Sequence, residues 1–187
     1  MILERHVRLS ALRHYFLALF GFLCIAGGVS LLWGAERIQA HTRYDLGVVS
    51  PYTKAVLAAS HKYHIEPELI AAVIIHESCI IGGDTDCRAI NPRLRGGANE
   101  IGAMQIHPAH FGNIPPARFE DPAFNIDFGT RLLRIALDQR QGNYFCGLSA
   151  YNTGPGIWCA NVKNYSGLTL QTYAMLKARR KTYLSPF

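Results

Sequence analysis

The residues from Tyr15 to Trp33 form a run of 19 without a single formal charge. A helix of that length covers about 28 Å, which is close to the roughly 30 Å hydrocarbon thickness of a bilayer. Tyr15 and Trp33 stand at its ends, where amphipathic rings favour the headgroup layer. The run predicts one transmembrane helix, so the remaining chain must fold separately from it.

Basic residues flank this run unequally. Arg5, Arg8 and Arg13 precede it, whereas Glu36 and Arg37 cancel just after it. The positive-inside bias therefore places the N-terminus in the cytoplasm and everything after the run across the membrane. A cleaved signal peptide is the alternative, although the run is longer than a usual signal sequence and no clean small-x-small cleavage site follows it.

The chain accordingly divides into four predicted parts. They are a cytoplasmic N-terminus (1–14), a transmembrane helix or signal anchor (15–33), a short polar linker (34–47) and one exported domain (48–187). The hydrophobic fraction of 49% and the charged fraction of 17% exclude a disordered chain. The net charge of +6 suits an anionic wall or membrane surface.

The cysteines fit an exported domain. Cys24 lies in the apolar run, and the other four, Cys79, Cys87, Cys146 and Cys159, lie beyond it. In an oxidising compartment an even set favours disulfides, and we expect Cys79–Cys87 and Cys146–Cys159 because short loops close easily. A zinc site is the alternative, but no two cysteines stand two residues apart and no histidine is suitably interleaved.

Helical spacing dominates the exported domain. Ser50 and Pro51 predict the start of a helix with Val56 on its apolar face, and Pro67 predicts a second helix that runs to about Ser78. The second helix is almost wholly apolar, so we expect it to be central and buried. Further helices are predicted over 125–140, up to 150 and over 170–181, with a small hairpin near 101–106. The fold class is mainly α with a minor β element (α+β).

Glu77 stands out because it ends the most hydrophobic helix, with Val73 and Ile74 on the same face. Burial disfavours a charged carboxylate and raises its pKa, and a carboxyl group that keeps its proton near neutral pH can act as a general acid. The alternative is an ordinary helix-end glutamate paired with Arg131 or Arg134.

The histidines do not indicate a metal site. His76 and Glu77 begin a zinc-protease motif, but position 80 is isoleucine where that motif needs a second histidine. We expect no metal and no other cofactor, and no nucleic-acid-binding signature is present. Two pairs with ligand-like spacing are interpreted as surface histidines: His61 with His64, and His107 with His110.

Three short strings in a fixed order carry a family resemblance. They are AAVIIHES at 71–78, GAMQI at 102–106 and AYNTGP at 150–155. Together they resemble the catalytic domain of lytic transglycosylases of the soluble-lytic-transglycosylase (SLT) type, which share a fold with goose-type lysozyme (glycoside hydrolase family 23). The resemblance covers roughly residues 48–165 and implies a lysozyme-like domain after the transmembrane helix.

The resemblance also implies roles for individual residues. Glu77 would be the single catalytic acid, and a strand with Gly102, Met104 and Gln105 would line the saccharide cleft. Aromatic and thioether groups stack on sugar faces, and amides satisfy sugar hydroxyl and acetamido groups. The segment 96–101 departs from the family pattern because it contains no serine. The full set of expected substrate-binding residues is Ser78, Gly102, Met104, Gln105, Tyr151 and Asn152.

The implied activity is cleavage of the β-1,4 bond between N-acetylmuramic acid and N-acetylglucosamine in peptidoglycan, with formation of a 1,6-anhydro ring. The implied location is the bacterial inner membrane, with the domain in the periplasm. Small members of this family often open the wall for secretion, conjugation or pilus machines. The alternatives are a hydrolytic goose-type lysozyme, with Asp84, Asp86 or Glu100 as a second carboxylate, and a non-catalytic wall-binding assembly protein.

Overall fold

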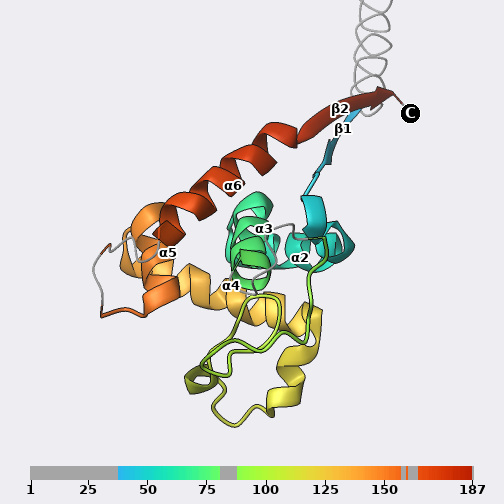
Figure 1. Ribbon diagram of the computed structural model, residues 1–187. Coiled ribbons are helices and arrows are strands. Elements are labelled where there is room, and N and C mark those ends of the chain that lie inside the picture. Colours follow the sequence, from blue (N-terminus) through green and yellow to red (C-terminus); the bar gives the residue numbers. More distant parts are fainter. Residues whose placement is uncertain (1–37, 81–87, 157–158, 160–163, 187) are drawn as a thin grey trace, which may run out of the picture. The chain divides into compact units, whose positions relative to one another are not determined.

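The computed structural model describes residues 38–80, 88–156, 159 and 164–186, which divide into two units. One unit is the domain from Tyr44 to Arg180, and the other contains a pair of strands from the two sides of that domain in the sequence (Figure 1). The transmembrane helix expected over 15–33 lies outside the described residues. Within the described residues, no helix has the length and apolar character needed to cross a membrane.

The paired strands are β1 (Ile38–Arg43) and β2 (Lys181–Pro186). They run antiparallel, with Ile38 opposite Pro186 and Arg43 opposite Lys181. Neither strand was predicted, since β1 falls in the expected polar linker and β2 follows the expected last helix. The two strands are far apart in the sequence and are not joined by a turn, so the sequence contains no local hairpin signal that would predict their pairing.

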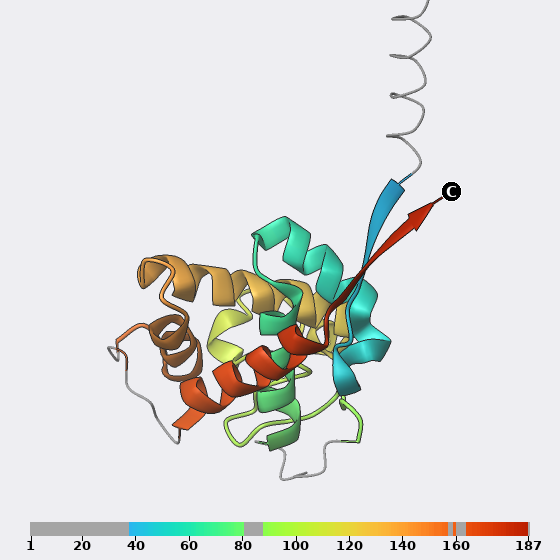
Figure 2. The same cartoon turned by 90° about the horizontal axis from the view of Figure 1, so that it is seen from above.

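The domain itself is built from helices, as predicted (Figures 1 and 2). A 3-10 helix at Gly47–Tyr52 precedes the first of them, and shorter helical turns lie at His76–Ile80, Pro108–His110 and Pro116–Glu120. The α-helices are α2 (Thr53–Tyr63), α3 (Pro67–Ile75), α4 (Pro122–Gln139), α5 (Tyr144–Thr153) and α6 (Tyr165–Arg179).

Helix α3 lies in the middle of the domain, with the other helices around it (Figures 1 and 2). Pro67 occupies its first turn, where a fixed φ and a missing N–H cost nothing. Every residue from Pro67 to Ile74 is buried, which confirms the predicted central helix. Burying that much apolar surface is the main stabilising contribution available to a domain of this size.

The first helix begins differently from the prediction. Ser50 and Pro51 do not cap an α-helix, because both lie inside the preceding 3-10 helix. The α-helical part begins at Thr53, whose hydroxyl donates a hydrogen bond of 2.8 Å to the carbonyl oxygen of Ser50. Val56 is fully buried, so the apolar face was correctly predicted even though the start was not.

The hairpin predicted near 101–106 is a tight turn. Ile101 and Ile106 exchange two backbone hydrogen bonds of 3.0 Å each, but they form only isolated bridges and no strand. Gly102 and Gln105 have φ angles of +83° and +44°, in the left-handed region. The predicted hairpin is therefore reduced to a turn that is closed by the bridge between Ile101 and Ile106.

One predicted disulfide, Cys146–Cys159, is confirmed, and it links the first turn of α5 to the segment that follows this helix. Cys79 is also disulfide-bonded, but its expected partner Cys87 lies outside the described residues. A sulfur that forms a disulfide cannot serve as a thiolate ligand, so the zinc alternative is excluded at Cys146 and Cys159.

Candidate active site

A cleft of about 660 Å³ opens beside Glu77, and its size is typical of small-molecule sites. Its lining residues come from the end of the central helix, the turn at 101–106, α4 and the end of α5. The lining includes Glu77, Glu100, Gln105, His107, His110, Leu132, Ile135, Tyr151 and Asn152.

Glu77 is the buried acid of this cleft, with only 5% of its surface exposed. Burial, and to a smaller extent the charge of Glu100, raise the pKa of its carboxyl group to about 8. The Tyr165 hydroxyl donates a hydrogen bond of 2.7 Å to its Oε1, which favours the ionised form and opposes part of that rise. Near neutral pH Glu77 therefore holds a proton that it can give to an oxygen atom in the cleft.

Glu77 lies in a turn in which the type of helix changes. α3 ends at Ile75, and a π-helical turn continues from His76 to Ile80. Such turns occur frequently at functional sites. Within it Glu77 lines the cleft, while the hydroxyl of the next residue, Ser78, donates a hydrogen bond of 2.8 Å to the carbonyl oxygen of Ala103. Ser78 thus fastens the helix end to the turn at 101–106.

Asn125 on α4 holds that turn from the other side. Its Oδ1 accepts a hydrogen bond of 2.8 Å from the N–H of Met104, and its Nδ2 donates to the carbonyl oxygens of Ile101 (2.8 Å) and Phe119 (2.9 Å). A β-carbon at Gly102 would lie 2.3 Å from Nδ2, so this close approach requires glycine. The Asn125 side chain thus provides hydrogen-bond partners for backbone groups that are not paired in a sheet.

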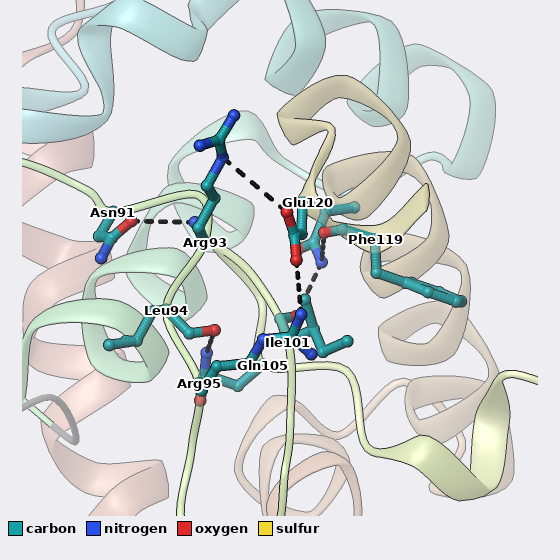
Figure 3. A network of polar contacts seen from close by, with 9 residues as sticks. Asn91, Arg93, Leu94, Arg95, Ile101, Gln105, Phe119 and Glu120 are labelled. Carbon is teal, nitrogen blue, oxygen red and sulfur yellow. Dashed lines mark hydrogen bonds and ion pairs between the residues drawn. The ribbon is translucent and has the colours of Figure 1, made fainter. Parts of the chain in front are cut away.

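The loop before the turn is fastened by charged and polar contacts (Figure 3). Arg93 and Arg95 both pair with Glu120. The Nε2 of Gln105 donates to the carbonyl oxygens of Gly102 (2.8 Å) and Leu94 (3.3 Å). Because both bonds use the amide nitrogen, the Oε1 of Gln105 is left as a hydrogen-bond acceptor beside the cleft.

The structure brings some of the predicted site residues together and separates others from the cleft. Gln105, Tyr151 and Asn152 line the cleft with Glu77. Ser78 and Gly102 are buried and are not among the residues that line this cleft.

Met104 contradicts its predicted role. We expected its thioether to stack on a sugar, but the side chain is fully buried. It packs against Gly129, and its sulfur accepts a contact of 3.8 Å from the Thr130 hydroxyl. The prediction failed because it assumed a strand, whereas the turn directs this side chain into the core. Its carbonyl oxygen accepts a hydrogen bond of 2.8 Å from the Tyr151 hydroxyl, which fixes that ring at the cleft.

Tyr165 is the functional residue that the sequence analysis missed. It is the first residue of α6 and lies 88 positions from Glu77, so no local spacing connects the two. Burial and the nearby charge of Glu77 raise the pKa of Tyr165 well above its usual value, so its hydroxyl stays a hydrogen-bond donor. The arginine alternative for Glu77 is wrong at Arg134, which pairs with Asp138.

His107 and His110 were interpreted as surface histidines, and both are indeed exposed, but they also line the cleft. The Nδ1 of His107 accepts a hydrogen bond of 3.1 Å from the N–H of Ala109, so its neutral ring carries hydrogen on Nε2. Burial, and the nearby His107 and Arg131, lower the pKa of His110. This side of the cleft therefore offers hydrogen-bond donors.

The comparisons with known proteins agree with this geometry. The model of the Transglycosylase SLT domain family matches residues 54–172, a range that includes Glu77 and Tyr165. A transglycosylase of Enterobacteria phage PRD1 is 32% identical over 131 residues, which are 69% of this chain and 45% of the phage protein.

A solved structure shares the fold. It is an inactive mutant of the lytic transglycosylase Slt from Pseudomonas aeruginosa, with a TM-score of 0.54 and 18% identity over 67% of this chain and 24% of Slt. The chain thus spans less than half of either relative's length. The family match covers most of the domain and all of the residues around the buried acid, and we conclude that this chain belongs to the Transglycosylase SLT domain family.

Proposed function

We propose that this chain is a lytic transglycosylase that cleaves the β-1,4 bond between N-acetylmuramic acid and N-acetylglucosamine in peptidoglycan. The observation that carries the proposal is Glu77, a buried carboxyl group with a pKa of about 8 at the wall of a 660 Å³ cleft. Membership of the SLT family supports it.

Glu77 acts first as an acid and then as a base. It donates its proton to the glycosidic oxygen, the bond from that oxygen to C1 of the muramoyl residue breaks, and N-acetylglucosamine leaves with a free hydroxyl group. The acetamido group of the muramoyl residue stabilises the positive charge at C1. The Glu77 carboxylate then takes the proton of the C6 hydroxyl, and that oxygen bonds to C1 and closes the 1,6-anhydro ring.

Tyr165 assists the ionised state between these two steps. Its hydroxyl bonds Oε1 of Glu77 at 2.7 Å, so a negative charge formed there already has a donor in place. Because the second nucleophile is the substrate's own hydroxyl, the reaction consumes no water and needs one carboxyl group only.

The other cleft residues suit a saccharide. The half-buried ring of Tyr151 gives a flat apolar surface on which a sugar can stack, and Ile135 extends the apolar wall on α4. The Oε1 of Gln105 accepts hydrogen bonds, and the exposed amide of Asn152 both donates and accepts them. Sugar hydroxyl and acetamido groups need partners of both kinds.

Hydrolysis is the second candidate, and Glu100 is the observation that favours it. Glu100 lines the same cleft as Glu77, as the second carboxylate of a glycosidase must. In that enzyme Glu100 would position a water molecule that attacks C1. The other acids considered, Asp84 and Asp86, lie outside the described residues.

Product analysis separates these reactions. Peptidoglycan digested with the purified chain should yield muramoyl ends lighter by one water than the corresponding reducing ends, as detected by mass spectrometry. Reducing ends with no such deficit would favour the hydrolase, and an unaltered glycan would favour a non-catalytic wall-binding protein. Glu77→Gln is the negative control for this digestion, because it removes the titratable proton and keeps the shape of the side chain.

The location follows as part of the proposal. The apolar run at 15–33 would anchor the chain in the inner membrane, and the domain would act in the periplasm, opening the wall locally for a secretion, conjugation or pilus machine. The Cys146–Cys159 disulfide supports an oxidising compartment. Alkylation of the isolated protein without reductant should modify Cys24 at most, and labelling of the other cysteines would argue against export.

A further inference from the structure

Glu100 is a carboxylate whose position is fixed by its own loop. Its backbone carbonyl oxygen accepts a hydrogen bond of 3.0 Å from the N–H of Gly96, and its Oε2 accepts one of 2.9 Å from the N–H of Ala98. The side chain is half-buried and lines the cleft that Glu77 also lines. A negative charge is therefore held at the wall of the cleft without an arginine or lysine bonded to it in the described part of the chain.

The lack of a side chain at Gly96 leaves room for the carboxylate of Glu100. A β-carbon at Gly96 would lie 2.3 Å from Oε2 of Glu100 and 2.5 Å from Oε1 of Gln105. The two oxygens share the space that a side chain at position 96 would fill. Any larger residue at position 96 would force Glu100 and Gln105 to move.

We propose that Glu100 is a positioning residue for the general acid, and that its charge at the cleft wall keeps the proton on Glu77 until the substrate accepts it. The inference rests on the proposed function, since it assigns a role only if Glu77 is the acid. It goes further because it names a second carboxylate that the single-acid mechanism does not use.

The groups around Glu77 support this role. The Tyr165 hydroxyl on α6 stabilises the ionised carboxylate, whereas the charge of Glu100 on the loop disfavours it. Tyr151 on α5 is uncharged, because burial raises the pKa of its hydroxyl well above neutral pH. The charge of Glu100 therefore offsets the effect of Tyr165 on the Glu77 carboxyl group.

The test compares Glu100→Gln, Glu100→Asp and the wild-type full chain. The pKa of Glu77 is measured by carbon NMR of its carboxyl group, and the pH dependence of kcat is measured on soluble glycan strands. Glu100→Gln should lower the pKa of Glu77, so that the alkaline limb of the profile moves to lower pH by about 0.5 to 1 unit.

Two controls sharpen the result. Glu100→Asp keeps the charge and should keep the alkaline limb close to that of the wild type. Asp138→Asn removes one negative charge from an exposed ion pair with Arg134 on α4 and should leave the limb unchanged. Added salt should move the wild-type limb to lower pH and affect Glu100→Gln less, because the half-buried charge is screened.

An unchanged NMR pKa of Glu77 in Glu100→Gln would overturn the inference. So would a loss of activity at every pH without a change in that pKa, because Glu100 would then act directly on substrate or water. The NMR titration needs no catalysis, so it can succeed even if product analysis rejects the transglycosylase reaction. The two proposals therefore fail in distinguishable ways.

Discussion

The two ends of the central helix each carry a buried glutamate in very different surroundings. Glu68, 1% exposed, lies in the first turn of α3, where the helix dipole stabilises negative charge. The guanidinium of Arg180 lies 3.5 Å from its Oε1. Glu77, 5% exposed, lies just beyond the last turn, and its hydrogen-bond partner is the neutral hydroxyl of Tyr165.

This difference teaches that burial alone does not make a carboxyl group an acid catalyst. At the N-terminal end, the dipole and a cation stabilise charge, and the glutamate ties α3 to Arg180 just after α6. At the C-terminal end, the dipole disfavours negative charge, no cation of the described residues forms an ion pair with the carboxyl group, and the group keeps its proton. The cleft of about 660 Å³ opens at the second end, beside Glu77.

The largest expected effect is on catalysis. Glu77→Gln should reduce the rate of glycan cleavage by about 10² to 10⁴-fold, because the proton donor is lost. Glu68→Gln, the matched change at the other end of α3, should stay within a few-fold of the wild type when muropeptide release is measured. Equal losses of activity in both variants would show that a disturbed α3, and not the loss of the proton on Glu77, lowers the rate.

The wild type and Glu77→Gln should also differ in how their free energy of unfolding depends on pH. The pKa of Glu77 is raised from 4.5 to about 8 in the folded chain, so folding takes up a proton between these pH values. The free energy of unfolding should fall as pH rises through this window, by at most about 1.4 kcal/mol per pH unit, and level off above pH 8.

Urea unfolding at several pH values measures this dependence. Glu77→Gln cannot ionise, so it should gain stability over the wild type as pH rises, by on the order of 3 kcal/mol at pH 7. The two proteins should be similar below pH 4.5. A difference that stays constant with pH would mean that Glu77 is not protonated in the folded chain.

A smaller effect is expected from two tyrosines of α6, which donate hydrogen bonds to glutamates at opposite ends of α3. Tyr165→Phe removes the donor to Glu77, so kcat should fall by about tenfold and the alkaline limb should move to higher pH, opposite to Glu100→Gln. Tyr173 donates a hydrogen bond of 2.6 Å to Glu66 at the other end of α3, and Tyr173→Phe is the matched control. It should leave the pH profile in place.

The smallest effect should come from the ion pair at the N-terminal end. Glu68→Gln and Arg180→Gln should each lower the free energy of unfolding by about 1 to 2 kcal/mol, since Arg180 is partly exposed. In a double-mutant cycle measured by thermal or urea unfolding, the double variant should lose less than the sum. Strict additivity would show that the pair contributes nothing.

The sequence predicted the parts of this molecule that depend on local spacing. The apolar run in α3 predicted its burial, and the burial predicted a perturbed acid at Glu77. The burial of α3 and the perturbed acid at its end need only the helical period. Tyr151 and Gln105 were assigned through the resemblance of short strings to the SLT family, and both line the cleft.

What could not be predicted depends on long-range contacts or on unusual backbone angles. Tyr165 reaches Glu77 across 88 positions, and β1 pairs with β2 from the other side of the domain in the sequence. Met104 was assigned to the cleft through the family resemblance, which matched Gly102, Met104 and Gln105 to a cleft-lining strand. The segment is instead a turn with left-handed conformations at Gly102 and Gln105, and neither periodicity nor composition reveals them.

The three hydrogen bonds of Asn125 have a consequence for how this cleft can vary. One amide does for the turn at 101–106 what a neighbouring strand does in a sheet, because it binds the backbone of Ile101, Met104 and Phe119. The residues between Ile106 and Phe119, such as the exposed Gly112, take no part in these three bonds, so insertions there should leave the turn in place. Aspartate at position 125 would turn two attractions into repulsions, so the tolerance of this long connection depends on a single nitrogen atom.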